Sequence, residues 1–221
     1  MGNTLTIFDL DNTLIQGDSS TVWSQFMVRE GLATQKGYLA REARLMADYD
    51  RGEMNIADYV ALIQAPLAGI PKSDVDALVA RCVREAILPR VYPQAWELIR
   101  RLRAEGEQML IISASVSLLV QAVAAALGID QALGIDVAMV DGGYSGIIAG
   151  IPSYQQGKVA RLAQWREVHP QYDGEVTFYT DSINDLPLCL HADRVRLVNP
   201  CPQLQAAGAG YGWPVLSWRL E

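Results

Sequence analysis

The sequence predicts an α/β protein, with a mostly parallel sheet flanked by helices and a helical segment inserted near its start. Three short apolar runs, within residues 4–8, 109–112 and 176–179, are continuous rather than alternating, as in strands that are buried on both faces of a parallel sheet. From residue 91 onward, strand patterns alternate with helix patterns, which is typical of a parallel sheet with helical crossovers. Residues 16–90, in contrast, have helical periodicity with hardly any strand signal.

The length and composition fit one large domain or two modest ones. The chain has 221 residues, of which 50% are hydrophobic, and this is enough for a substantial core. Its 18 basic and 25 acidic residues give a net charge of −7, without the basic patch that is typical of a nucleic-acid-binding protein. No apolar run approaches the roughly 18 residues that a membrane span needs. We therefore expect neither nucleic acid nor membrane among its partners.

The cysteines and the N-terminus indicate a cytoplasmic protein. Cys82, Cys189 and Cys201 are widely spaced, so they indicate neither a disulfide framework nor a zinc site. A strand pattern begins almost at the first residue, without the charged and apolar regions of a signal peptide. The pattern indicates no particular oligomeric state.

The opening strand, within residues 4–8, is followed at once by Asp9 and Asp11, with Thr13 two places further on. Residues i and i+2 share one face of a strand, so two carboxylates just past a strand end can converge on one point. Neighbouring carboxylates repel each other unless a cation lies between them, and Mg²⁺ prefers a few carboxylates together with water and phosphate oxygens. The alternative interpretation of either aspartate alone is an acid in a turn after a strand.

The helical segment that follows contains several helices separated by breaks. Asp18 is placed to cap the first helix, and further helical patterns cover residues 38–49 and 56–63 and a stretch that begins at Ser73. Arg51-Gly52 and a loop containing Pro66, Gly69 and Pro71 separate them. We expect residues 16–90 to form a helical cap domain, and residues 1–15 and 91–221 to form the α/β core.

The remaining elements follow in α/β order. Pro93 opens a helix, since proline is well placed in a first helical turn, and Gly106 ends it. The patterns then predict a strand at 109–112, a helix at 116–127, a strand, turn and strand at 135–140, 141–143 and 144–148, a helix at 155–165, a strand at 176–179, a helix at 186–190 and a strand at 195–198.

Three of the predicted strands end in polar residues. Asp9 and Asp11 follow the first, Ser113 follows the second, and Asp181 follows the strand at 176–179. In parallel sheets ligands bind beyond the carboxyl ends of the strands, so these side chains mark a candidate site. Other interpretations remain: Ser113 as the cap of the helix near residue 116, and Asp181 with Asp185 as acids that stabilise the start of the helix at 186–190.

Four motifs in this order resemble those of the haloacid dehalogenase superfamily of phosphohydrolases. The first is D-x-D-x-T, here Asp9-Leu10-Asp11-Asn12-Thr13. Ser113 resembles the second motif and Lys158 the third, while the segment from Asp181 to Asp185 is similar to the acidic fourth motif, D-x-x-N-D. The helical insertion resembles the cap of the phosphoserine-phosphatase-like branch, which includes histidinol-phosphatase-like members. The resemblance implies a Rossmann-like core with an inserted cap domain.

This resemblance implies a Mg²⁺-dependent phosphatase that acts on a small phosphorylated metabolite. Asp9 would be the nucleophile that forms an aspartyl-phosphate, Asp11 the general acid and base, and Lys158 the cation that keeps Asp9 ionised. The implied metal ligands are Asp9, Asp181 and, through its backbone carbonyl, Asp11, while Asp185 would orient a water molecule or Lys158. The implied phosphate-binding groups are Ser113, the N–H groups that follow it, including that of Ala114, together with Lys158 and Asn184.

Two positions depart from the phosphoserine phosphatase pattern. Asp18 stands where those enzymes typically carry glutamate, and Ala114-Ser115 stand where they tend to have glycine. The shorter acid argues against contact with the ammonium group of phosphoserine, although Asp18 is suited to a cationic group of another phosphomonoester, such as the amine of histidinol phosphate. Arg44 is a candidate anion-binding residue of the insertion.

Two alternatives to hydrolysis remain open at this point. The first is transfer of the phosphoryl group to an acceptor alcohol, which differs only in what attacks the aspartyl-phosphate. The second is a catalytically silent module that binds a phosphorylated metabolite. The presence of every reactive group favours an enzyme.

Overall fold

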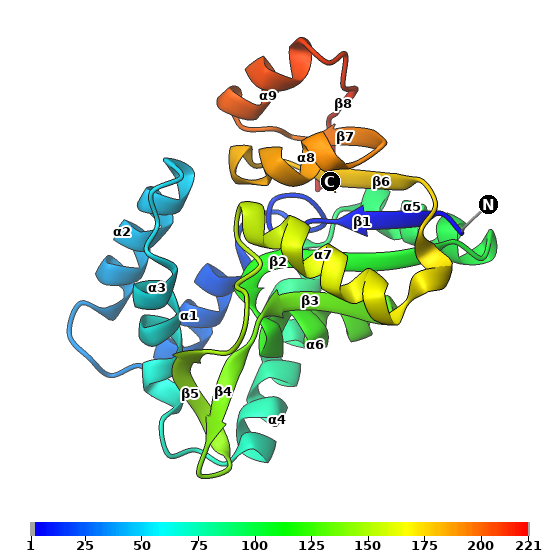
Figure 1. The fold of residues 1–221 in the computed structure, drawn as a ribbon. Coiled ribbons are helices and arrows are strands. Elements are labelled where there is room, and N and C mark those ends of the chain that lie inside the picture. The colour runs from blue at the N-terminus through cyan, green and yellow to red at the C-terminus, as the bar shows by residue number, and fades with distance from the viewer. Residues whose placement is uncertain (1–2, 221) are drawn as a thin grey trace.

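The computed structural model describes residues 3–220, and its centre is a six-stranded sheet (Figure 1). The strand order is β3-β2-β1-β6-β7-β8, and all neighbouring strands run parallel. The strands are β1 (Leu5–Phe8), β2 (Gln108–Val116), β3 (Gln131–Ile135), β6 (Val176–Thr180), β7 (Arg194–Val198) and β8 (Val215–Leu216). The predicted α/β fold with a mostly parallel sheet is confirmed.

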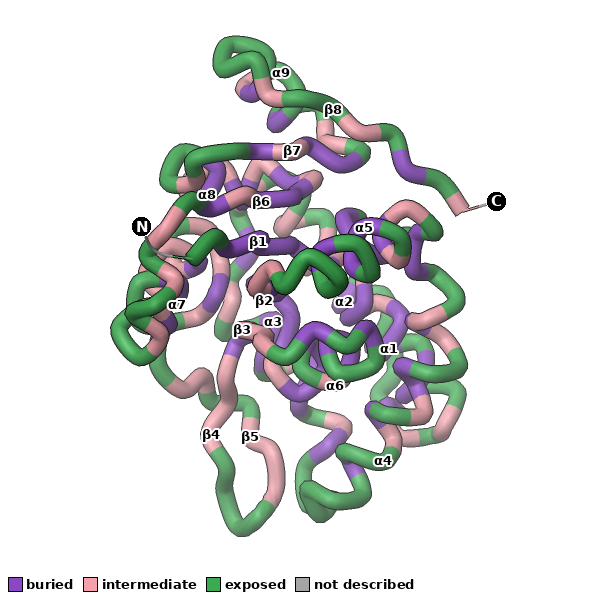
Figure 2. Tube along the Cα trace, turned by 90° about the vertical axis from the view of Figure 1, so that its right-hand side faces the viewer, coloured by how far each residue is buried: buried purple, intermediate pink, exposed green. Residues whose placement is uncertain are grey.

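Helices cover both faces of this sheet. Leu5 and Ile7 of β1 pack in a cluster with residues of α7 (Gln156–Val168), α8 (Leu186–His191) and α9 (Pro202–Ala209). Phe8 points to the other face and packs in a cluster with α5 (Pro93–Ala104) and α6 (Ser117–Leu127). The trace of β1 is buried along its whole length (Figure 2), which explains why its sequence is a continuous apolar run.

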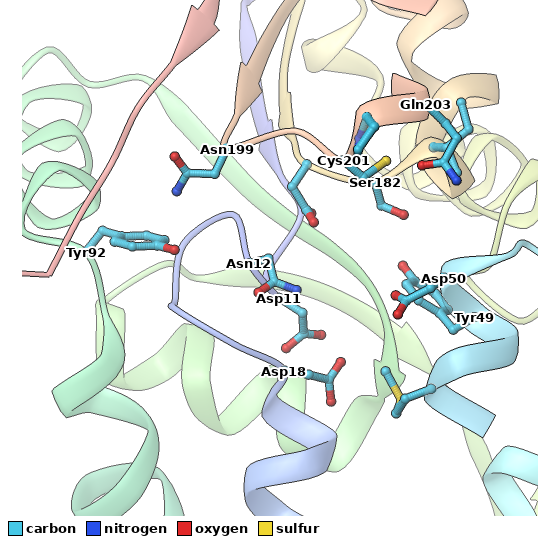
Figure 3. Close-up of a pocket in the computed structure, with 14 residues that line it drawn as sticks. Asp11, Asn12, Asp18, Tyr49, Asp50, Tyr92, Ser182, Asn199, Cys201 and Gln203 are labelled. Carbon is cyan, nitrogen blue, oxygen red and sulfur yellow. The ribbon is translucent and has the colours of Figure 1, made fainter. Parts of the chain in front are cut away.

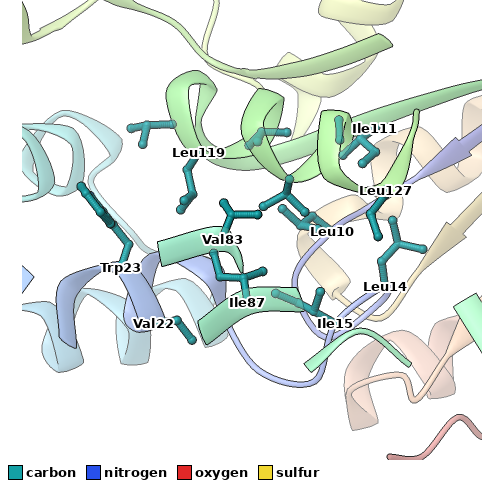
Figure 4. Close-up of a cluster of buried hydrophobic side chains, with 14 of the residues drawn as sticks. Leu10, Leu14, Ile15, Val22, Trp23, Val83, Ile87, Ile111, Leu119 and Leu127 are labelled. Atoms are coloured by element: carbon teal, nitrogen blue, oxygen red, sulfur yellow. The ribbon is translucent and has the colours of Figure 1, made fainter. Parts of the chain in front are cut away.

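Residues 19–82 form four α-helices and one short 3-10 helix. The α-helices are α1 (Ser19–Arg29), α2 (Tyr38–Asp50), α3 (Ile56–Gln64) and α4 (Lys72–Cys82), and the 3-10 helix is Ala65–Leu67. Asp18 caps α1 by accepting a hydrogen bond from the backbone N–H of Thr21, as its position in the sequence predicts. Apolar side chains of α1, among them Trp23, belong to the same buried cluster as Leu119 of α6 (Figure 4). No helix within residues 3–220 is both long and apolar enough to cross a membrane.

The predicted strand at 135–140 is wrong at its start. Ile135 ends β3, and a separate antiparallel hairpin of β4 (Val137–Val140) and β5 (Gly143–Ile148) begins after Asp136. The side chain of Asp136 is held at this break by Ser117 and by Arg161. A Cβ on Gly134 would lie 2.7 Å from Cα of Ser117, so β3 needs glycine there, and a glycine weakens the strand signal of the sequence.

The second strand is longer than predicted. β2 continues to Val116, so Ser113, Ala114 and Ser115 lie within the strand rather than after it. The following helix begins at Ser117 without any side-chain cap, and Ser113 therefore does not cap it. Two further short elements, β8 and α9, have no counterpart in the sequence-based prediction.

Candidate active site

The parallel order of β2, β1 and β6 brings three polar strand ends together. Phe8, the last residue of β1, pairs with Ile111 of β2 on one side and with Tyr179 of β6 on the other. The backbone N–H of Asp9 then donates to the carbonyl of Tyr179 at 2.9 Å. Asp9 is thereby fixed at the carboxyl edge of the sheet, between the ends of β2 and β6.

A buried lysine joins two of the predicted site residues. The Nζ atom of Lys158 lies 2.8 Å from Oδ1 of Asp9 and 2.6 Å from Oδ1 of Asp185, and the lysine side chain has no exposed surface. The other carboxylate oxygen of Asp185 accepts a hydrogen bond from the hydroxyl of Thr180 at 2.7 Å. Burial lowers the pKa of Lys158, but the two carboxylates outweigh this effect and raise it. The lysine is therefore a fixed positive charge beside Asp9.

The acids of this centre carry more negative charge than Lys158 neutralises. Burial, against the attraction of Lys158, and the nearby carboxylates of Asp185 and Asp11 together raise the pKa of Asp9 to about 7. Burial and the charges of Asp9 and Asp185 likewise raise the pKa of Asp181 well above its usual range. The hydroxyl of Thr13 donates to Asp181 at 3.1 Å. The cluster therefore favours a further cation.

The donor set fits Mg²⁺. Within residues 3–220, no three His, Cys, Asp or Glu side chains are grouped so that they alone could hold a metal ion. Mg²⁺ is usually bound by only one or two carboxylates, with water and substrate phosphate oxygens as its other ligands. Asp9 and Asp181 are such a pair, and they lie near enough that the charge of Asp9 raises the pKa of Asp181. The uncompensated negative charge beside Lys158 is the observation that favours the ion.

Hydroxyl and amide groups hold the side chain of Asp11. Ser113 and Ser115 of β2 donate to its Oδ2 atom at 3.2 and 2.9 Å, and the backbone N–H of Ser19 donates to its Oδ1 atom at 2.6 Å. Asp11 remains partly exposed in a cavity, whereas Ser113 is fully buried. These contacts hold the carboxyl group of Asp11 against β2, next to Ser113, the predicted phosphate-binding serine.

Two predicted residues are placed differently from the rest. The side-chain N–H of Asn184 donates to the backbone carbonyl of Tyr49 in α2 at 2.8 Å, so its amide is engaged by a helix rather than directed at Asp9. Arg44 lies exposed on α2 and lines a separate groove with Gln35 and Asp58. The structure does not bring Arg44 to the cavity that contains Asp11.

A cavity of about 430 Å³ opens beside these acids (Figure 3). Asp11, Asp18 and Asp181 line it. Ala114 lines a much smaller space between the core and α2, which Asp11 and Asp18 also line. Burial raises the pKa of Asp18, and the nearby charge of Asp11 raises it further. Several lining residues were not predicted, because they come from a helix end and from loops whose local sequence has no motif: Tyr49, Asp50, Tyr92, Asn199, Cys201 and Gln203.

Known proteins resemble this chain in sequence and in fold. A family model described as haloacid dehalogenase-like hydrolase matches residues 6–189. The chain is 33% identical to a histidinol-phosphatase of Neisseria meningitidis, over 97% of this chain and 99% of that protein. A protein of unknown function from Bordetella pertussis has a TM-score of 0.88 and 31% identity, and the match covers 98% of this chain and 99% of that one. A substrate-bound phosphoserine phosphatase, at 17% identity, shares the fold with a TM-score of 0.67 over 93% of this chain and 90% of that one.

The match to the family model spans the segment that contains all four motifs. The family model extends from β1 through α8, and therefore includes both Asp9 and Asp185. The likeness to the histidinol-phosphatase extends over almost the whole of both chains. The chain belongs to the haloacid dehalogenase-like hydrolases, and its relative from Neisseria is a histidinol-phosphatase.

Proposed function

We propose that this phosphatase hydrolyses a small phosphomonoester through a phosphorylated Asp9, with Mg²⁺ as its cofactor. The observation that carries the proposal is the buried ion pair between Lys158 and Asp9 at the edge of the sheet. A carboxylate attacks phosphorus only when it is ionised, and the charge of Lys158 opposes the effect of burial on Asp9. Asp11, two residues further on, lines the cavity in which a leaving group would lie.

The reaction has two steps that use the same two aspartates. In the first, an oxygen of Asp9 bonds to phosphorus as the bond to the leaving oxygen breaks, and Asp11 donates a proton to that oxygen. In the second, Asp11 takes a proton from a water molecule whose oxygen bonds to phosphorus, and the bond to Asp9 breaks to release inorganic phosphate. The hydroxyl groups of Ser113 and Ser115 keep the carboxyl group of Asp11 in place for both transfers.

Asp9, Asp181 and the backbone carbonyl of Asp11 would hold Mg²⁺. When bound, the ion neutralises charge on the phosphoryl oxygens and favours the ionised form of Asp9. Lys158 and the N–H group of Ala114 would supply positive and hydrogen-bonding groups for those oxygens, and Ser113 would do so only when its hydroxyl turns from Asp11 to the phosphoryl group. Asp185 is the second ion-pair partner of Lys158 and would thereby orient its ammonium group.

We infer that residues 16–90 act as a cap over this site. The cavity is lined by the core acids on one side and by Met46, Tyr49 and Asp50 of α2 on the other. A closed cap would exclude bulk water until the phosphoenzyme has formed and would contact the leaving group. The side chains of α2 that line the cavity would therefore influence which substrate the enzyme accepts.

The cavity favours a leaving group with a positive charge. Besides Asp11 and the proposed metal ligand Asp181, two further acids, Asp18 and Asp50, line it, and none of the lining residues is lysine, arginine or histidine. A carboxylate on the substrate would meet only like charges on those side chains, whereas an ammonium group would be attracted. We therefore propose an amino-alcohol phosphate such as histidinol phosphate, the substrate class in the name of the Neisseria relative, in preference to phosphoserine.

An activity panel tests this proposal. We expect turnover of p-nitrophenyl phosphate with Mg²⁺, a higher kcat/KM for histidinol phosphate than for phosphoserine, and no turnover by Asp9→Asn. Adding glycerol and measuring glycerol phosphate separates hydrolysis from transfer to an alcohol. A wild-type protein that binds these esters without turnover would be a silent binding module, and the proposal would fail.

A further inference from the structure

Two core side chains hold the end of α2 and the loop after it. The Nδ2 atom of Asn184 donates to the carbonyl of Tyr49 at 2.8 Å, and the Nε2 atom of Gln155 donates to the carbonyl of Gly52 at 3.1 Å. Gln155 also donates to Oδ1 of Asn184 at 3.2 Å, so the two amides are joined to each other. We call Gln155, Asn184 and these two carbonyls the α2 latch. The ring of Tyr154 lies against the ring of Tyr49, with centroids 5.8 Å apart, and adds an apolar contact.

The backbone of Gln155 is unfavourable for a residue with a side chain. Its φ of 49° and ψ of −122° lie in a region that glycine adopts far more readily. Such a conformation is strained and persists only where the surroundings impose it, often at functional sites. A glycine at position 155 would relieve this strain, but it would remove the amide that contacts Gly52. The retained side chain therefore indicates a use for that amide.

The other side of the latch is built for a close approach. Gly52 has a φ of +74°, and a Cβ atom there would lie 3.3 Å from Oδ1 of Asn184 and 3.6 Å from Nε2 of Gln155. A side chain at position 52 would thus both strain the backbone and crowd the two amides. Glycine allows the loop to lie directly on the core.

The latch connects the end of α2 to the catalytic centre. Gln155 precedes α7, which carries Lys158 on its first turn, and Asn184 is adjacent to Asp185. Tyr49, whose carbonyl is held, lines the cavity with its side chain, and its hydroxyl group lies beside Ser182. From this arrangement we infer that Gln155 is a positioning residue, which keeps the end of α2 closed over the cavity and so sets the place of Tyr49. The effect on activity rests on the proposed function, whereas the closure itself does not.

The test compares Gln155→Gly with Gln156→Gly. Gln156 is the exposed neighbour of Gln155 and takes no part in the latch, so it is a matched control. Trypsin cleavage after Arg51, which is exposed beside Gly52, reports opening of the latch. We expect cleavage there to be at least about tenfold faster in Gln155→Gly than in the control, with a Tm no lower than that of the control because the strain is relieved.

The kinetic readout separates positioning from chemistry. Opening of the closed form lowers the fraction of competent enzyme, so KM for p-nitrophenyl phosphate should rise roughly tenfold while kcat stays within about twofold of wild type. Cleavage after Arg51 at the control rate would overturn the inference, as would a fall in kcat at unchanged KM. If the wild-type protein shows no turnover at all, the proposed function fails, and the cleavage rates alone decide on the latch.

Discussion

The ammonium group of Lys158 lies 2.8 Å from a carboxylate oxygen of Asp9, and both side chains are buried. Such a pair contributes less to stability than its charges suggest, because both ions lose their hydration. Removing one partner is nevertheless costly, since the other charge is then left alone in the interior. Here Lys158 forms ion pairs with both Asp9 and Asp185, and its loss would leave both carboxylates without a cation.

We therefore expect Lys158→Met to lower the free energy of unfolding by about 3–5 kcal/mol in urea titrations. Its kcat for p-nitrophenyl phosphate should fall at least about a hundredfold, because a preorganised positive charge at the phosphoryl group is lost. Adding Asp185→Asn to Lys158→Met removes one of the unpaired charges and should restore part of the stability but none of the activity. Wild-type stability in the single variant would contradict the ion-pair account.

Mg²⁺ should stabilise the folded protein through Asp181. A ligand that binds only the native state adds about 2.7 kcal/mol when its concentration is one hundred times its Kd. In thermal scans we expect Mg²⁺ to raise the Tm of the wild-type protein, and EDTA to abolish both this rise and the activity. Asp181→Asn should lose the rise in Tm while it keeps its fold, since Thr13 can still donate to the side-chain oxygen. An equal rise in both proteins would place the ion elsewhere.

Asp18 should discriminate between substrates. Asparagine caps a helix about as well as aspartate does, so Asp18→Asn keeps the cap of α1 and removes only the charge. We expect this variant to lose roughly tenfold in kcat/KM for histidinol phosphate and less than about twofold for p-nitrophenyl phosphate, which has no ammonium group. Equal losses for the two substrates would mean that Asp18 acts on the fold or on Asp11 rather than on the substrate charge.

Glu42 should make stability depend on pH. This buried carboxyl group of α2 accepts a hydrogen bond from the hydroxyl of Thr21, and burial raises its pKa above 4.5, its usual value. A raised folded-state pKa means that the native state holds the proton more tightly than the unfolded chain does. The stability that this provides is complete below pH 4.5 and is lost as the pH rises through the folded-state pKa.

Glu42→Gln should consequently be more stable than the wild-type protein at pH 7.5, with the difference shrinking toward pH 4. Urea titrations at several pH values measure this difference. Glutamine keeps an oxygen for the hydroxyl of Thr21, so the comparison isolates the charge. A variant that loses stability at pH 7.5 would show that the ionised form of Glu42 is favourable where it lies.

The sequence predicts the centre of this fold because the strongest signals are local. The apolar runs before Asp9 and at 176–179 lie in β1 and β6, which are buried on both faces and therefore lack alternation. The rule that ligands bind at the carboxyl edge then brings Asp9 and Asp181 together without any knowledge of their contacts. Lys158 lies on helix α7, and only the resemblance of the four motifs indicated that it joins them. The edge strand β3, with glutamine, alanine and glycine, has no comparable run.

Contacts between distant segments are where the predictions differ from the structure. Nothing near Asn184 in the sequence indicates that its amide meets the carbonyl of Tyr49, which is 135 positions away. Arg44 and Tyr49 lie on the same helix, and only the packing of α2 against the core decides that Tyr49 faces the cavity and Arg44 does not. The positive φ of Gln155 is likewise imposed by its surroundings and not by its own sequence.

Phosphorylation of Asp9 is the most direct test of the mechanism. Enzyme mixed with Mg²⁺ and p-nitrophenyl phosphate, quenched in acid and digested, can be mapped by mass spectrometry, and Asp11→Asn should accumulate the intermediate because the second step lacks its base. We predict a phosphoryl group on the peptide that carries Asp9, absent from Asp9→Asn. A phosphoryl group on any other residue, or turnover by Asp9→Asn at the wild-type rate, would contradict the account.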